Sequence, residues 1–400
     1  MTRIGGTSRR RKAAAGLSVA VGGALAAVAL VEPVGSASTR PAVRTLAVRQ
    51  ASGPVAGLFV AAGRVRGPRD AALAGTASSP LSGWVAPVAV PSADGSQLVY
   101  STWRELRHDD PALSWSKQGI RPGQPLGTPT LWVHDFRSGR DSVVDRNAFS
   151  AAVRADGAVA YVRGRDVYRA FTPYAGDVVV RSSLSAKPVV WSTAPALYVA
   201  AAWAGDTLLV QRIGEGEQLD LFALDGPGRQ RLLMAHAALV AVSPDGRQAF
   251  VANSDAVQPG AVSLVDVADG TVVSTLELAS LEPGLEWAAY GGAWAGDRVV
   301  APTNAGIAVF DVAAGAISLA ELLKPDPQVF PDGIVEPQFS GDGEHVVARG
   351  DAPDGADGER TSALECDLRT ATCLAEAAEP GRDWLHPAYN PSRPLKGGGS

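Results

Sequence analysis

The residues of this sequence best suited to chemistry are aromatic and charged side chains gathered in one polar stretch. They are Trp103, His108, Asp109, Asp110, Trp115 and Arg121. Flat tryptophan rings can stack on a sugar or a peptide, while acids and an arginine orient the bound molecule. The alternative is a solvated loop whose tryptophans cover neighbouring strands, because exposed charges and aromatics are common in loops without a ligand. We expect no metal, since the adjacent residues 108–110 do not readily converge on one ion.

Motifs for covalent or acid–base catalysis are absent from the sequence. The chain has no nucleophile elbow, no zinc-binding histidine pair, no phosphate loop and no dinucleotide fingerprint. His134 and His345 fall inside strand-like runs, where a structural histidine is expected. Asp351, Asp354 and Asp357 recur at a spacing of three, whereas calcium loops of the EF-hand type alternate acids at a spacing of two. We therefore predict no catalytic residue, no metal ion and no cofactor.

The only two cysteines are expected to form a disulfide. When ECDLRTATCL is aligned with the phrases LVDVADGTVV and VFDVAAGAIS, Cys366 and Cys373 replace apolar residues. With a hairpin turn centred on Arg369-Thr370, the two cysteines face each other at a separation that a disulfide can bridge. A buried pair of free thiols is the alternative. The replaced apolar pairs are Val265 with Val272 and Phe310 with Ile317.

These residues are positioned by a sequence motif that recurs along the chain. In this motif a tight acidic or glycine turn leads into a strand, and a second strand, an aspartate and a hairpin turn follow. The clearest copy is VSPDGRQAFVAN at 242–253, followed by AVSLVDVADGTVVSTL at 261–276. A repeat of this length cannot bury its apolar face alone, so strand quartets imply a closed ring of small sheets. We predict an all-β fold, a β-propeller of four-stranded antiparallel blades, with six blades favoured and seven as the alternative. Related turns stand at Asp94-Gly95, Asp156-Gly157, Gly205-Asp206, Gly296-Asp297 and Asp342-Gly343.

Many acidic residues of the repeat have a structural explanation. Asp-Gly pairs favour hairpin turns because these turns need positive φ angles. Other aspartates end an apolar stretch just before a turn, where the carboxylate can accept hydrogen bonds from the amides ahead of it. These are Asp135, Asp225, Asp266, Asp311 and Asp367. Trp203 and Trp294 occur in the matching phrases AAWAGD and GAWAGD, which favours a role in packing between blades.

The N-terminus is typical of an export signal. Basic residues up to Lys12 precede an uncharged run at 13–31, and small residues before Ala37 suit a signal peptidase. An uncleaved membrane anchor is the alternative, although the run is rich in alanine and glycine. The stretch SRRRK at 8–12 is loosely similar to a twin-arginine signal.

Charge argues against nucleic acid as a partner. The whole chain has 36 basic and 41 acidic residues, and loss of residues 1–37 removes five bases and one acid, which leaves a net charge of −9. A body of this charge is not attracted to nucleic acid or to anionic lipid. We expect contact with a membrane only through an uncleaved N-terminal segment.

The chain is expected to divide into four parts. Residues 1–37 form the export signal, 38–80 a linker with a possible closing strand, 81–390 the propeller and 391–400 a flexible tail. Blade-like units are expected at 84–145, 151–181, 197–234, 239–278, 287–319 and 335–377. A seventh blade is the alternative, assembled from residues 41–75 and the segment around Trp384.

The repeat resembles that of known propeller families. PSADGSQLVYST, VSPDGRQAFVAN and FSGDGEHVVARG look like the blades of TolB-like and WD-repeat-like propellers, and AFVANSDAVQPGAVSLVDVADGTVVSTLEL is similar to the surface-layer repeat with a YVTN signature. The resemblance implies binding or scaffolding outside the cytoplasm. It carries no catalytic residue over to this chain.

Long insertions are expected on a single face. If each Asp-Gly turn joins the first two strands of a blade, the gaps at 104–128, 214–217, 254–260 and 350–360 all lie between second and third strands. Such connections emerge on the same rim, where propellers usually carry variable contacts. We predict an exported, non-enzymatic propeller that binds a protein, a peptide or a cell-envelope glycan there. The alternative is a propeller hydrolase or lactonase with acids and a histidine in its channel, with or without a divalent cation.

Overall fold

The computed structural model describes most of the chain between residues 42 and 384. All described residues belong to one compact unit, Pro41–Ser400, which is divided from Met1–Arg40. This part of the chain has no helix long and apolar enough to cross a membrane. The expected export signal, residues 1–37, and the tail, residues 391–400, lie outside it. The described residues are 42–50, 59–61, 64–66, 84–91, 97–105, 125–135, 137–138, 140–164, 176–192, 197–213, 219–253, 260–287, 292–325, 334–339, 344–352, 360–375 and 382–384.

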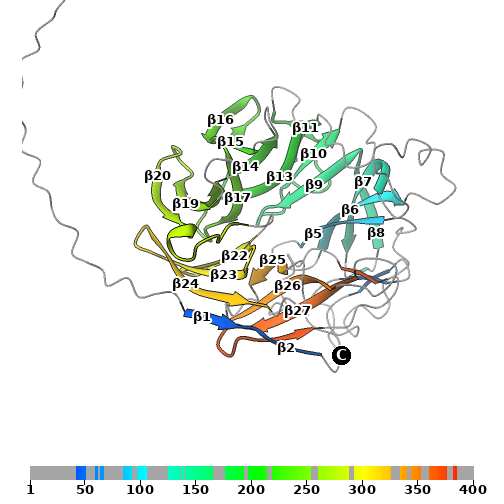
Figure 1. Cartoon of the computed structure of the whole chain (residues 1–400). Coiled ribbons are helices and arrows are strands. Elements are labelled where there is room, and N and C mark those ends of the chain that lie inside the picture. Colours follow the sequence, from blue (N-terminus) through cyan, green and yellow to red (C-terminus); the bar gives the residue numbers. More distant parts are fainter. Residues whose placement is uncertain are drawn as a thin grey trace, which may run out of the picture. The chain divides into compact units, whose positions relative to one another are not determined.

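Six sheets are each built from four strands that are consecutive in sequence and pair antiparallel (Figure 1). We number these sheets blades 1 to 6 in chain order. The prediction of four-stranded antiparallel blades is confirmed. Blades 1 to 3 comprise β5 (Trp84–Pro91), β6 (Gln97–Glu105), β7 (Pro125–Asp135) and β8 (Arg140–Arg146); β9 (Ala148–Val153), β10 (Val159–Gly164), β11 (Gly176–Arg181) and β12 (Val189–Val190); and β13 (Leu197–Ala204), β14 (Thr207–Ile213), β15 (Leu219–Gly226) and β16 (Arg229–Met234).

Blades 5 and 6 each gain a fifth strand from the N-terminal part of the unit. These strands, β1 (Ala42–Thr45) and β2 (Ala47–Gln50), pair in parallel with the last strand of each blade. Blades 4 to 6 comprise β17 (Ala237–Val242), β18 (Gln248–Asn253), β19 (Ala261–Asp266) and β20 (Val272–Glu277), followed by the short 3-10 helix Leu278–Ser280; β21 (Ala293–Ala295), β22 (Arg298–Thr303), β23 (Gly306–Ala313) and β24 (Ala316–Lys324); and β25 (Ile334–Phe339), β26 (His345–Ala352), β27 (Arg360–Asp367) and β28 (Thr372–Ala375).

A seventh, smaller sheet joins the two ends of the unit. The hairpin β3 (Phe59–Ala61) and β4 (Arg64–Arg66) pairs with β29 (Arg382–Trp384), in the order β29-β3-β4. This sheet, which we call the closing sheet, lies beside β27 of blade 6. It uses the segments from which the sequence predicted an alternative seventh blade, so the six full blades are accompanied by a three-stranded one.

The burial of each strand follows from its place in the blade. In blade 4 the middle strands β18 and β19 are buried almost throughout, whereas the last strand β20 is largely exposed. A middle strand has a neighbouring blade against each of its faces, so both sets of alternating side chains must be apolar. Between blades 4 and 5 the core contains Phe250 and Phe310, whose ring centroids lie 5.2 Å apart, and Trp294 meets Phe250 edge to face. The predicted packing role of Trp294 is confirmed.

The Asp-Gly turn joins the first and second strands of its blade, as the sequence predicts. In blade 4 the amide of Gly246 donates to the carbonyl of Ser243, and the Asp245 carboxylate accepts from the amide of Arg247. Gly246 has a φ of +71°, and a Cβ atom there would collide with the backbone of Gly205 in the turn of blade 3. Glycine is therefore required both by the turn and by the contact between neighbouring turns.

The aspartates that end apolar stretches behave in two ways. Asp135, Asp266 and Asp367 accept hydrogen bonds from the amides just ahead of them, as predicted. Asp225 instead accepts a hydrogen bond from the Thr207 hydroxyl at 2.7 Å. Asp311 lies 4.0 Å from the Arg298 guanidinium. The last two therefore contact the neighbouring second strand, which the sequence did not indicate.

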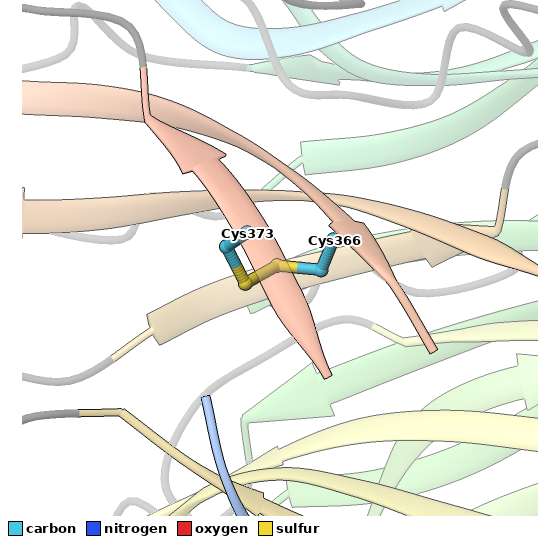
Figure 2. The surroundings of a disulfide bond; sticks show 2 residues. All are labelled: Cys366 and Cys373. Atoms are coloured by element: carbon cyan, nitrogen blue, oxygen red, sulfur yellow. A yellow bond between two sulfur atoms is a disulfide. The ribbon is translucent and has the colours of Figure 1, made fainter. Parts of the chain in front are cut away.

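The disulfide predicted between the two cysteines is confirmed (Figure 2). Cys366 on β27 and Cys373 on β28 lie directly opposite each other, with their Cα atoms 3.9 Å apart, and both are fully buried. In blade 4 the aligned residues Val265 and Val272 are paired in the same way. In blade 5 the alignment is wrong. The turn of this hairpin is tighter, with Ala313 opposite Ala316, so Phe310 pairs with Leu319 and not with Ile317.

We expect the disulfide to stabilise the propeller by restricting the unfolded chain. Its loop of eight residues corresponds to about 2.5 kcal/mol in the chain-entropy estimate. The variant Cys366→Val with Cys373→Val restores the apolar pair found in blade 4, so its loss of stability measures the cross-link and not the packing. Urea unfolding without reductant should show this loss. If the valine variant unfolds at the same urea concentration as the oxidised protein, the cross-link contributes nothing.

Candidate functional site

Five of the six blades have a connection of five or more residues after the second strand. These connections span 106–124 between β6 and β7, 165–175 between β10 and β11, 214–218 between β14 and β15, 254–259 between β18 and β19, and 353–359 between β26 and β27. Because the second strand is antiparallel to both neighbours, these connections leave the blade at the end opposite to the Asp-Gly turn. We call these two ends the loop end and the turn end. The predicted position of the insertions between second and third strands is confirmed.

Of the predicted binding residues, only Trp103 is among the described residues, in the half of β6 nearer the loop end. Trp103 lies in β6, where its backbone is opposite Trp84, and its side chain is outside what the structure describes. Arg104 and Glu105 pair with Leu126 and Pro125, so the connection 106–124 starts and ends on neighbouring strands. The other five predicted residues lie in that connection, outside the described residues. They are His108, Asp109, Asp110, Trp115 and Arg121.

The turn end carries a hollow that the sequence did not indicate. Its volume is about 440 Å³, and the first turns of blades 2, 3 and 4 line it. From the sequence we expected the Asp-Gly turns to have a structural role only, since each turn is explained by its own blade. Their meeting depends on contacts between blades, such as that of Gly246 with Gly205. The charged lining residues are Arg154, Asp156, Asp206 and Asp245.

Arg154 ties the turns of blades 2 and 3 together at this hollow. Its guanidinium donates two hydrogen bonds to Asp156, at 2.9 and 2.6 Å, and one to Asp206 in the next blade, at 2.7 Å. The guanidinium also lies over the ring of Trp203, 4.8 Å from its centroid. Trp203 in turn donates to the carbonyl of Ala152 and packs against the core between blades 2 and 3. The predicted packing role of Trp203 is confirmed, but its ring also lines the hollow.

Two carboxyl groups of the hollow, those of Asp156 and Asp245, have lowered pKa values. The hydrogen bond from Arg154, aided by the amide of Ala158, lowers the pKa of Asp156 to about 2. The hydrogen bonds from the Ser243 hydroxyl and from the amide of Arg247 lower the pKa of Asp245. A general acid needs a pKa raised towards the working pH. These two groups are therefore suited to fixing the turns and not to donating a proton.

A search for metal sites in the described part of the chain finds no group of three or more histidine, cysteine or acidic side chains that could hold an ion. Of the aspartates spaced by three, Asp351 lies in β26. Asp354 and Asp357 lie in the connection 353–359, outside the described residues. The spacing argument about calcium stays a prediction.

His134 is a structural histidine, as the sequence predicted. It is fully buried in β7, and its Nδ1 lies 3.1 Å from a carboxylate oxygen of Asp141 on the neighbouring strand β8. The Tyr100 hydroxyl donates to the same oxygen at 2.5 Å. Three strands of blade 1 are thereby joined through one carboxylate. The contacts of Tyr100 and His134 with Asp141 could not be predicted from the sequence, because the three residues lie on different strands.

Comparison with known proteins finds similarity in fold alone. No family model matches the chain, and no curated protein matches it either. TolB from Acinetobacter baumannii has a similar structure at 13% identity, with a TM-score of 0.42 and a match over 84% of this chain and 67% of that one. The β-propeller domain of the Trilobed protease from Pyrococcus furiosus matches at 11% identity, with a TM-score of 0.44, over 71% of this chain and 83% of that one.

A third similar structure is the β-propeller domain of Cps50 (Swd1) from Myceliophteria thermophila. It is 12% identical, with a TM-score of 0.43, and the match covers 74% of this chain and 98% of that one. The expected likeness to TolB and other β-propellers is thus found at the level of the fold. The fold assignment itself is carried by the order and pairing of the strands in this chain.

The Asp156 carboxylate is expected to stabilise the protein in a pH-dependent way. Since its folded pKa of about 2 lies below the ordinary value of 3.8, its contribution is present above about pH 4 and is lost as the pH falls towards 2. Because the carboxylate is half exposed, Asp156→Asn should cost no more than about 1 kcal/mol at pH 7. Urea unfolding at pH 7 and near pH 2 measures both effects.

The matched control is Asp297→Asn, at the equivalent turn of blade 5. A stability difference between Asp156→Asn and the wild type that stays constant down to about pH 2 contradicts the assigned role of the Arg154 ion pair.

Proposed function

We propose that this protein is an exported, non-enzymatic β-propeller that binds a protein, a peptide or a cell-envelope glycan at its loop end. One observation carries the proposal: in five of the six blades a connection of five or more residues follows the second strand, and these five connections leave at the same end. Variable loops held together by a rigid scaffold are the usual place for binding residues. In this proposal Trp103 and Trp115 are the stacking surfaces, and the neighbouring acids and arginine orient the ligand.

The chemistry of the turn end supports this choice of surface. The charged residues that line its hollow already have partners, since Arg154 binds Asp156 and Asp206 while Asp245 accepts a hydrogen bond from the Ser243 hydroxyl. A partner that bound these groups would first have to separate them, and the cost would oppose binding. The lowered pKa values of Asp156 and Asp245 argue against either group as a general acid.

Export is tested by the N-terminus of the mature protein. If the signal is cleaved where the small residues predict, the protein recovered from the extracytoplasmic fraction should begin at Ser38. N-terminal sequencing and the intact mass measure this directly. A protein that retains residues 1–37 and sediments with membranes would instead be anchored.

Binding is tested by variants at the two ends. The purified protein is applied to arrays of cell-envelope glycans and extended peptides, and the affinity of each ligand found is then measured by calorimetry. Trp115→Ala should weaken binding by about 30-fold, since loss of a central aromatic anchor costs about 2 kcal/mol. Replacement of 106–124 by a short Gly-Ser connection should abolish it.

Asp206→Ala is the matched control, because its side chain is fully exposed at the turn end. We expect its affinity to equal that of the wild type. Undiminished binding by the variant with the shortened connection, or loss of binding in Asp206→Ala alone, would place the site elsewhere.

A further inference from the structure

Residues 42–50 form a strap across the outer edges of blades 5 and 6. The strand β1 pairs in parallel with β24, from Ala42 opposite Glu321 to Thr45 opposite Lys324. The strand β2 then pairs in parallel with β28, from Ala47 opposite Thr372 to Gln50 opposite Ala375. Figure 1 shows the strap in blue beside the yellow and orange strands of these blades. One extended segment therefore covers two sheet edges that belong to different blades.

Leu46 anchors the strap at the point where it crosses from one blade to the other. Its side chain is 1% exposed, and it packs in a core formed by both blades, which includes Val309, Leu323 and the disulfide. Its amide donates to the carbonyl of Lys324 at 2.8 Å, and the next amide, of Ala47, donates to the carbonyl of Ala371 at 2.9 Å. A single aliphatic side chain thus fills a pocket between the blades.

Arg44 is the second anchor, two residues before Leu46. Its guanidinium donates to the carbonyls of Leu368 and Arg369 in the last turn of blade 6, at 2.7 and 2.6 Å. It also donates to the carboxylate of Glu321 in blade 5, at 3.3 Å. Charge and geometry at this position therefore select an arginine, whose planar group reaches two blades at once.

The other side chains of the strap that the structure describes are exposed. Ala42, Thr45, Ala47 and Arg49 are exposed, and Val43 is 54% exposed. Among the described residues of the strap, recognition therefore depends on backbone pairing and on the side chains of Arg44 and Leu46, at alternate positions. This is how extended peptides are bound at sheet edges, where backbone hydrogen bonds supply affinity and pockets for alternate side chains supply specificity.

We propose that the joined outer edges of blades 5 and 6 form a docking groove for an extended segment with an arginine two residues before a leucine. Residues 42–50 occupy this groove as an exchangeable ligand in cis. The occupant in trans is a segment of the same chemistry in a partner polypeptide, which competes with the strap. The groove lies at the outer edges of the blades and is independent of the loop end proposed above.

The test removes the two anchor side chains of the strap and measures the binding of a separate peptide to the groove. The full chain carrying Arg44→Ala and Leu46→Ala is titrated into a fluorescently labelled peptide AVRTLAVRQ, and anisotropy is measured. We expect this variant to bind the peptide at least about tenfold more tightly than the wild type does, because its own strap no longer competes. A peptide with alanine at both anchor positions should bind at least about tenfold more weakly. Val43→Ala with Arg49→Ala, at exposed strap positions, should behave as the wild type.

If the anchor variant, which carries Arg44→Ala and Leu46→Ala, does not fold, hydrogen exchange on the wild-type protein tests the same proposal. The amides of Leu46 and Ala47 should exchange at least about tenfold faster than those of β23, because an exchangeable segment opens without the blades. Exchange of the strap at the rate of β23, or equal affinity of the anchor variant for both peptides, would overturn the proposal. A dimer of the anchor variant with exchanged straps would replace the separate partner by a second copy and would overturn it as well.

Discussion

The burial of every middle strand between two neighbouring blades is the constraint on which the rest of the structure depends. Strands such as β18 and β19 have no solvent face, so nearly all their side chains are apolar and no blade can bury them alone. The chain must therefore stack its sheets in order and keep their turns in register. The contact of Gly246 with Gly205 and the ion pair of Arg154 with Asp206 follow from that stacking. The same order collects the long connections at one end.

The N-terminal part of the unit has two structural roles. It pairs with the C-terminal part of the chain, and it covers outer sheet edges that the stacked blades leave free. The hairpin β3–β4 pairs with the C-terminal strand β29, so distant parts of the sequence share one small sheet. The strap before it covers the outer edges of blades 5 and 6, which would otherwise present unpaired backbone groups. The strap pairs directly with the strand that carries one end of the buried disulfide, where Val48 is opposite Cys373. Closure and edge protection thus come from residues 42–66, within the region 38–80 that the sequence predicted to be a linker with a possible closing strand.

Local and repeated features of the fold could be predicted from the sequence, whereas contacts between blades could not. The strand quartets, the Asp-Gly turns and the pairing of Cys366 with Cys373 each follow from residues close together in the chain. The meeting of Arg154 with Asp206 and the joining of Tyr100 and His134 through Asp141 depend on neighbours in space. The pairing of Phe310 with Ile317 was wrong because the hairpin of blade 5 has a tighter turn than that of blade 6, although the repeat has the same length in both. The predicted binding residues around Trp115 stay a prediction.

The central claim is that the loop end, and not the turn end, meets the partner. The most direct measurement places a photoreactive phenylalanine analogue at Trp115 in one version of the protein and at Asp206 in another, and identifies what each version cross-links in intact cells. The account expects one defined partner to be captured from position 115 and not from position 206. Capture of the same partner from position 206 alone would contradict it.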